Sequence, residues 1–460
     1  MAKDDKKSSK KKGKTKKSLA ELEERAEQLR ERLARTEAKI AVSKGLVPGQ
    51  SPLATKFPPL PEVAGVRFAT AAAGVKYKGR LDVMLAEIAE GSAIAGVFTK
   101  SATRSAPVDW CKAKLADLKK GAPKGPMAIV VNSGNANAFT GDNGMKGVAA
   151  TARAAAKAVG GAQRGVFISS TGVIGEALPA DKITSQLAEM TKWLTPGDLP
   201  LAAEAIMTTD TFPKGAGKTI DLDGVTVNIA GIAKGSGMIA PDMATMLGYV
   251  FTDAPVSRAL LQSMLSRGTK TSFNAATVDS DTSTSDTVLV TATGKAGGKR
   301  ISSRRDPRAE AFEAALNEVL QDLAKQIVRD GEGATKFVSV KVKGAKTDRS
   351  AAIIARAIAN SPLVKTAIAG EDPNWGRVVM AVGKSGQPAN RDRLSIHFGD
   401  TLVADKGWVA DSYTEEAGAA YMQGDEIEIT ADLGIADGAA EVWTCDLTHG
   451  YITINADYRS

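Results

Sequence analysis

The sequence has little cysteine, histidine or aromatic residue. In 460 residues there are two cysteines and two histidines, and aromatic residues make up 5% of the chain. Cys111 and Cys445 are far apart and lack metal-ligand spacing, so we expect two reduced cysteines, with no disulfide and no metal site. Neither His397 nor His449 stands in a recognisable Ser-His-Asp context. We therefore look for chemistry that needs no histidine.

Long apolar runs are also missing. No run approaches the roughly 20 residues that span a bilayer, and the N-terminus lacks the apolar segment of a secretory signal. With 43% hydrophobic and 24% charged residues, the chain is long enough to bury a large core in two or three domains. We expect a soluble, cytoplasmic protein with no membrane partner.

The net charge of +8 is concentrated at one end. Residues 1–17 contain nine lysines and two aspartates, a net charge of +7. We expect this low-complexity tail to be disordered. The nearly neutral remainder lacks the basic footprint of a nucleic-acid binder, so we expect no nucleic-acid partner for the body.

The pattern predicts five regions. After the tail, residues 18–43 form a charged helix with a short heptad seam, which either lies solvated on the body of its own chain or self-associates. Residues 44–62 hold five prolines from Pro48 onward and form a linker. An α/β body over 63–340, which contains the candidate catalytic residues named below, and a smaller C-terminal domain over 341–460 follow.

Hydrophobic periodicity predicts a mixed α/β fold. Strands are expected at 63–78, 95–99, 128–132, 166–170, 225–229, 246–251 and 338–342, and in the alternating stretch from Tyr451. Helices are expected at 81–89, 144–159, 179–190, 254–266, 307–328 and 349–359.

Thr245 is the candidate nucleophile. It stands between a glycine-rich loop and an apolar, strand-like run from Met246. Such a threonine suits a self-processing enzyme, in which its hydroxyl attacks the carbonyl of Ala244 and the Ala244–Thr245 bond is hydrolysed. The freed α-amine, with a pKa of roughly 7.7 to 8.0, can serve as the base for the hydroxyl. The alternative is that Thr245 only begins a strand.

The residues around Thr245 carry a longer pattern. Lys-Gly-Ser-Gly-Met-Ile-Ala-Pro-Asp-Met-Ala-Thr-Met-Leu, which starts at Lys234, resembles the cleavage-site signature of the glutamate N-acetyltransferase / ornithine acetyltransferase family of arginine biosynthesis. The similarity extends from about Val63 to Ser460. It implies a layered αββα self-processing fold with a smaller C-terminal α/β domain.

The resemblance also implies a reaction. Members of the family move an acetyl group from N-acetylornithine to glutamate through an acetyl ester on the threonine, here Thr245. They hold no bound cofactor, and some also use acetyl-CoA as donor. The α and β fragments of one precursor are expected to assemble as an α2β2 heterotetramer.

Matching positions assign further site residues. Thr171 and Gly172 correspond to the oxyanion pair, although their glycine-rich segment can also be a simple turn. Thr208, Lys234, Glu332, Asn455 and Ser460, with Thr245, correspond to substrate-binding residues.

Two other segments resemble family motifs. The asparagine-rich segment 132–138 either contributes to the active site or is turn chemistry alone. In the segment 272–286, Ser280 and Ser285 stand where we expect glycine and asparagine, which puts only local turn geometry in question.

Two other functions stay open at this point. A related self-processing aminopeptidase or amidase would work by the same general mechanism. Those enzymes, however, resemble a pattern with serine as the nucleophile, whereas this chain has Thr245. In the second alternative, the tail and heptad helix make the chain a scaffold or nucleic-acid adaptor on an inactive body.

Overall fold

The computed structural model describes residues 49–240 and 246–456. The chain divides into two compact units, residues 1–50 and Ser51–Ser460, and the second is described here. The predicted tail at 1–17, the helix at 18–43 and the first part of the linker, 44–48, lie outside the described residues.

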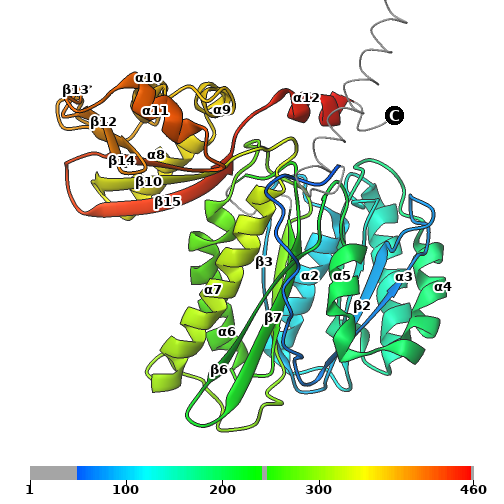
Figure 1. The fold of residues 1–460 in the computed structure, drawn as a ribbon. Helices are drawn as coiled ribbons and strands as arrows, with labels where there is room; N and C mark the ends of the chain where they lie inside the picture. Colours follow the sequence, from blue (N-terminus) through cyan, green and yellow to red (C-terminus); the bar gives the residue numbers. More distant parts are fainter. Residues whose placement is uncertain (1–48, 241–245, 457–460) are drawn as a thin grey trace, which may run out of the picture. The chain divides into compact units, whose positions relative to one another are not determined.

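Two sheets form the centre of the larger unit (Figure 1). The first has four strands in the order β1-β2-β4-β5, and the second has five in the order β3-β9-β8-β7-β6. Neighbours are antiparallel except for the parallel pairs β4 with β5 and β8 with β9. The strands are β1 (Val66–Ala71), β2 (Val83–Ile88), β3 (Ala93–Phe98), β4 (Met127–Asn132), β5 (Val166–Ser170), β6 (Lys214–Asp221), β7 (Thr226–Lys234), β8 (Leu247–Thr252) and β9 (Thr287–Ala292).

The two sheets pack face to face. Alternate residues of β2 point to opposite sides: Met84 and Ala86 join the cluster shared by both sheets, whereas Val83 and Leu85 join the cluster on the outer face. Between the sheets, Phe68 of β1 meets Phe251 of β8 edge-on, with ring centroids 5.0 Å apart. Strands buried on both faces read as continuous apolar runs, which explains the composition of this half of the chain.

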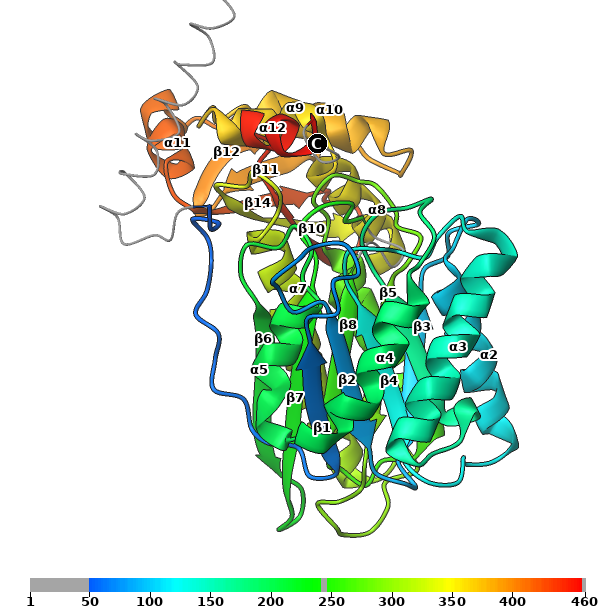
Figure 2. The same cartoon turned by 90° about the vertical axis from the view of Figure 1, so that its right-hand side faces the viewer.

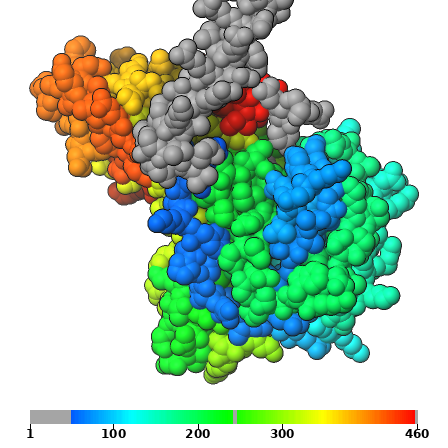
Figure 3. Space-filling model, turned by 45° about the vertical axis from the view of Figure 1, so that its right-hand side comes forward, coloured from blue at the N-terminus to red at the C-terminus, as the bar shows by residue number. Residues whose placement is uncertain are grey.

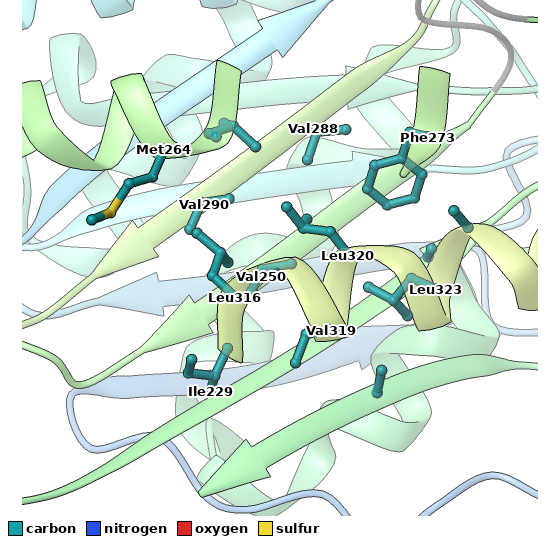
Figure 4. Packing of buried hydrophobic residues seen from close by; sticks show 14 of the residues in the cluster. Ile229, Val250, Met264, Phe273, Val288, Val290, Leu316, Val319, Leu320 and Leu323 are labelled. Carbon is teal, nitrogen blue, oxygen red and sulfur yellow. The ribbon is translucent and has the colours of Figure 1, made fainter. Parts of the chain in front are cut away.

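Helices cover both outer faces of the sheet pair: α3 (Gly141–Val159) and α4 (Ala180–Met190) the first sheet, and α6 (Arg258–Gly268) and α7 (Pro307–Arg329) the second. Helices α2 (Ala106–Asp117) and α5 (Leu199–Ala205) add buried residues to the cluster that the two sheets share. In Figure 4, Leu316, Val319, Leu320 and Leu323 of α7 form one stripe against Val250 and its neighbours in the second sheet. Helices α3 and α4 cover the first sheet in the same way. The helix–sheet–sheet–helix order confirms the predicted αββα class.

A third sheet has a core of its own. Its six strands have the order β13-β12-β11-β14-β10-β15. They are β10 (Phe337–Ala345), β11 (Ser395–Phe398), β12 (Thr401–Asp405), β13 (Trp408–Val409), β14 (Glu426–Asp432) and β15 (Gly438–Cys445). The remaining helices are α8 (Asp348–Ala359), α9 (Pro362–Ala369), α10 (Trp375–Lys384), α11 (Glu415–Met422) and α12 (His449–Ala456).

No single helix among the described residues is long and apolar enough to cross a bilayer. Helices α8 and α9 reach a sufficient length and apolar composition only when they are counted together, and the chain bends by 56° at the break between them.

The extended segment after residue 50 lies along β6 (Figures 2 and 3). Phe57 and Leu60 occupy the space that a side chain at Gly215 would fill, and Leu60 with Pro61 does the same at Gly217. This part of the proline-rich linker is therefore packed on the second sheet.

Two predicted elements are wrong. The helix expected at 81–89 is strand β2, because a short apolar run buried on both faces has no period that separates helix from strand. The strand expected from Tyr451 is helix α12, which has no buried residue and is not paired in any of the three sheets. The helix expected from 254 starts at Arg258, where the Ser257 side chain accepts a hydrogen bond from the Leu260 N–H.

Candidate active site

One cavity of about 280 Å³ collects most of the predicted site residues. They come from separate elements: Thr171 and Gly172 follow β5, Thr208 lies between α5 and β6, Lys234 ends β7, Glu332 follows α7 and Asn455 belongs to α12. Ala244, Thr245 and Ser460 lie outside the described residues.

The chain directly after Thr245 is anchored in the second sheet. Met246 donates its N–H to Asp286 Oδ1 at 3.0 Å, and its carbonyl accepts the Thr287 N–H at 3.2 Å. Leu247, the next residue, pairs with Lys234 across β7 and β8. The described residue that follows the candidate nucleophile is thus bonded to Asp286 and Thr287, next to the end of the strand that carries Lys234.

Asp286 was missed by the sequence analysis. Burial raises the pKa of its carboxyl well above the usual range, against the opposing effects of the Met246 N–H and Lys234. Its Oδ2 is buried and has no hydrogen-bond partner within the part of the chain that the structure describes. This carboxyl therefore lies in a buried environment that disfavours its charged form.

The asparagine-rich segment supports the turn that carries Thr171 and Gly172. Asn132 donates from Nδ2 to the Asn135 carbonyl at 2.9 Å, and Asn135 Oδ1 accepts the Asn137 N–H at 2.8 Å. The Thr171 N–H bonds the Asn132 carbonyl at 3.0 Å. Of this segment, Ala136 is the residue that lines the cavity. The asparagines thus serve as turn chemistry that fixes the neighbouring loop.

Gly172 lies too close to this segment to carry a side chain. Its φ is +130°, and a Cβ would stand 2.6 Å from the Asn135 nitrogen. Only glycine combines this backbone conformation with so close an approach. The Gly172 N–H can therefore be presented at the cavity wall.

Gly172→Ala is expected to lower kcat of the reaction that the resemblance implies by about 10²-fold, because the loop must move and a backbone N–H donor moves with it. Gly175→Ala is the matched control: its φ is +85°, but nothing lies within 4 Å of a Cβ placed there. Steady-state kinetics of both variants test this, and equal losses in the two would attribute the effect to backbone strain alone.

Lys234 is buried and bonds two of the predicted hydroxyls. Its Nζ lies 2.9 Å from Thr171 Oγ1 and 3.0 Å from Thr208 Oγ1. An ammonium group can only donate, so both hydroxyls accept these bonds and keep their own protons for another partner. Burial lowers the pKa of Lys234, while the negative charge of Asp210 opposes that shift.

Glu332 provides the negative group in the cavity. Asn455 donates from Nδ2 to Glu332 Oε2 at 2.8 Å, and the Glu332 N–H bonds the Ser236 carbonyl at 2.9 Å. A Cβ on Gly237 would stand 2.5 Å from Glu332 Oε1, so the carboxylate lies directly against the glycine-rich loop. The cavity therefore holds a cation and an anion beside two hydroxyls. Within residues 49–240 and 246–456, no group of three or more His, Cys, Asp or Glu residues is placed to hold a metal ion.

Comparison with known proteins decides the family. The model of the ArgJ family matches residues 67–460. The chain belongs to the ArgJ family. Proteins named arginine biosynthesis bifunctional protein ArgJ are similar to it: that of Ruegeria pomeroyi is 60% identical and that of Brucella suis 57%. These alignments cover 89% of this chain and 98% and 99% of the relatives.

Two solved structures are also similar in part. A crystal structure of ArgJ from Bacillus halodurans is 42% identical with a TM-score of 0.44, and covers 45% of this chain and 96% of its own. A Mycobacterium tuberculosis ornithine acetyltransferase complexed with ornithine is 32% identical with a TM-score of 0.32, and covers 42% of this chain and 95% of its own.

Membership of the ArgJ family confirms the resemblance seen in the sequence. The chain is an arginine-biosynthesis enzyme of this family, and the acetyltransferase function is supported over the aminopeptidase and the scaffold.

Proposed function

We propose that this ArgJ-family chain cleaves itself between Ala244 and Thr245 and then moves an acetyl group from N-acetylornithine to glutamate through an ester on Thr245. One observation supports this most: a single cavity brings Thr171 and Gly172 together with a buried cation, Lys234, and a carboxylate, Glu332.

Self-cleavage comes first. The Thr245 hydroxyl attacks the Ala244 carbonyl, the peptide C–N bond breaks, and an ester to the hydroxyl replaces it. Water then hydrolyses the ester, which leaves fragments 1–244 and 245–460. The second fragment begins with a free α-amine that can accept the proton of its own hydroxyl.

The charged groups orient the substrates. N-acetylornithine carries a carboxylate and a side-chain ammonium, and glutamate carries carboxylates and an α-amino group. The Lys234 ammonium and the Thr208 hydroxyl, which can still donate its own hydrogen, can bind a substrate carboxylate. Glu332 can bind a substrate ammonium. Holding both ends places the reacting group near Thr245, which converts the reaction into an effectively intramolecular one.

Transfer then proceeds in two steps. Thr245 attacks the acetyl carbonyl while its α-amine takes the hydroxyl proton, and the tetrahedral oxyanion is stabilised by the Thr171 hydroxyl and the Gly172 N–H. Collapse of this intermediate expels ornithine, whose departing nitrogen takes the proton. The amino group of glutamate attacks the acetyl ester by the reverse route and leaves as N-acetylglutamate.

Acetyl-CoA is included in the proposal as a second donor and not as a bound cofactor. The similar relatives carry the name bifunctional, which supports two donors. The test mixes pure protein with glutamate and either N-acetylornithine or acetyl-CoA and measures N-acetylglutamate. Product from N-acetylornithine is expected, and its absence in cleaved, folded protein would overturn the proposed function. Formation of N-acetylglutamate from acetyl-CoA would show that acetyl-CoA is a second donor, and its absence would exclude acetyl-CoA as a donor.

We also propose an α2β2 assembly of the two fragments in the cytoplasm, on the strength of the family resemblance. Native mass spectrometry should show two copies of each fragment, and a stable single pair would contradict it.

Removal of residues 456–460 is expected to leave self-cleavage intact and to raise KM for both substrates. The deletion follows Asn455, which bonds Glu332, and it removes Ser460, a predicted substrate-binding position. Contacts made equally in the ground and transition states affect KM more than kcat. Ser460→Ala in the full chain separates the hydroxyl from the rest of the segment. Fully cleaved truncated protein with unchanged kinetics would contradict the assignment of Ser460.

A further inference from the structure

Asp210 is buried near the cavity and bonds the backbone at Thr208, which lines the cavity, and at Gly235, which follows the lining residue Lys234. Its Oδ2 accepts the Thr208 N–H at 2.9 Å, and its Oδ1 accepts the Gly235 N–H at 2.6 Å. Gly235 directly follows Lys234, and the Asp210 side chain is fully buried. A single carboxylate therefore ties together the two chain segments that bring Thr208 and Lys234 to the cavity.

The carboxylate is itself held by a buried lysine. Lys214 Nζ lies 2.7 Å from Asp210 Oδ1 and 2.5 Å from Asp330 Oδ2, and all three side chains are fully buried. Asp330 also accepts the Thr211 N–H at 2.9 Å and precedes Glu332 by two residues. Burial raises the pKa of Asp330, while the charge of Lys214 opposes that shift.

Four charged or titratable groups act on Lys234: Asp210, Lys214, Asp286 and Glu332. Burial and Lys214 lower the pKa of Lys234, and the three acidic groups raise it, with Asp210 as the largest single opposing group. Burial also acts on Asp210, but the charges of Lys214 and Lys234 outweigh it and hold the pKa of Asp210 below its usual range. The Asp210 carboxylate forms its ion pair with Lys214, and its negative charge also acts on Lys234.

We propose that Asp210 is a positioning residue: it fixes Thr208 and the Lys234–Gly235 backbone in place and supplies a buried negative charge behind the Lys234 ammonium. Asp210 acts through Lys234 and Thr208 and is not assigned a contact with substrate. The inference rests on the proposed function, because it assumes that Lys234 binds a substrate carboxylate.

Asp210→Asn keeps the shape and removes the charge. Without that charge the pKa of Lys234 falls further, so the ammonium loses its proton at a lower pH than in the wild type. A lysine must be protonated to bind a carboxylate, so the substrate affinity of the variant should weaken progressively as the pH rises. At lower pH Lys234 is protonated again, and the affinity should approach that of the wild type.

The experiment measures kcat and KM for N-acetylornithine between about pH 6.5 and about pH 8.5. For Asp210→Asn we expect KM to rise by roughly tenfold or more at the alkaline end and by about threefold at the acidic end, with kcat within about threefold. An unchanged KM, or the same rise at every pH, would overturn the proposal.

Asp82→Asn is the matched control. Asp82 is also a buried carboxylate that accepts two backbone N–H groups, those of Ala73 and Val75, each at 2.6 Å, and among the described residues it forms no ion pair with a lysine. Its substitution tests the general effect of removing a buried carboxylate that bonds the backbone. A pH-dependent KM in Asp82→Asn that matches the one in Asp210→Asn would also overturn the proposal.

Asp210→Glu is a second variant that tests the inference even if Asp210→Asn does not fold. The charge remains, so the pH profile should stay that of the wild type. The longer side chain cannot hold both N–H groups at their present distances, so KM should rise several-fold at every pH; an unchanged KM or a shifted profile would contradict the inference. Failure of the proposed function looks different, because the wild-type protein itself would then transfer no acetyl group.

Discussion

Thr245→Ala is expected to remain a single uncleaved chain and to lose acetyl transfer by at least about 10⁴-fold. The substitution removes the hydroxyl that attacks the Ala244 carbonyl, so the chain stays intact and no α-amine is released. The same hydroxyl is the group that carries the acetyl ester, so the second reaction is lost as well. Intact-mass spectrometry should show fragments 1–244 and 245–460 for the wild type and the full chain for the variant.

Thr191→Ala provides the matched control. Thr191 follows α4, where its hydroxyl bonds the Ala188 carbonyl at 2.8 Å, and it does not line the cavity. This variant should be cleaved and active. Active wild-type enzyme that consists only of the full-length chain would rule out the proposed mechanism, whatever the variants do.

Lys234→Met is expected to lower kcat/KM by about 10³-fold, largely through KM. Methionine fills a similar volume but cannot bind a carboxylate or donate to the Thr171 and Thr208 hydroxyls. These hydroxyls then lose the partner that fixes their orientation. Kinetics with both substrates should show the loss for each, because each carries a carboxylate.

The pH dependence gives a second test of Lys234. Its pKa is lowered by burial, so in the wild type the protonated fraction falls at a lower pH than for an exposed lysine. Wild-type kcat/KM should therefore decline on the alkaline side, and Lys234→Met should lose that decline. If the alkaline decline of kcat/KM persists unchanged in Lys234→Met, a group other than Lys234 causes it.

Lys365→Met is the matched control for losing a buried lysine. Lys365 lies in the lobe of the third sheet and donates to Thr444 Oγ1 at 2.9 Å. The substitution should destabilise the fold without altering the pH profile of cleaved enzyme. A comparable fall in kcat/KM would show that the Lys234 effect comes from stability alone.

The signature that starts at Lys234 was enough to indicate the family, and the family resemblance implied the layered architecture, whereas the spacing of apolar residues predicted a mixed α/β fold. The stripe of Leu316, Val319, Leu320 and Leu323 is visible because helical period and burial are local properties of the chain. The glycine expected at position 280 also agrees with the local backbone. Ser280, which stands there, has a φ of +67°, in the region that favours glycine. Six predicted site residues also line one cavity.

Only the tertiary structure decided what surrounds those residues. The contact of Lys214 with Asp330 joins positions 116 residues apart. No local sequence pattern predicts that a lysine is buried between two carboxylates. Strand β2 and helix α12 were misassigned for a related reason. An apolar or alternating run becomes a strand only where a neighbouring strand accepts its hydrogen bonds, and such a neighbour is set by the fold: β2 lies between β1 and β4, whereas α12 pairs with none of the three sheets.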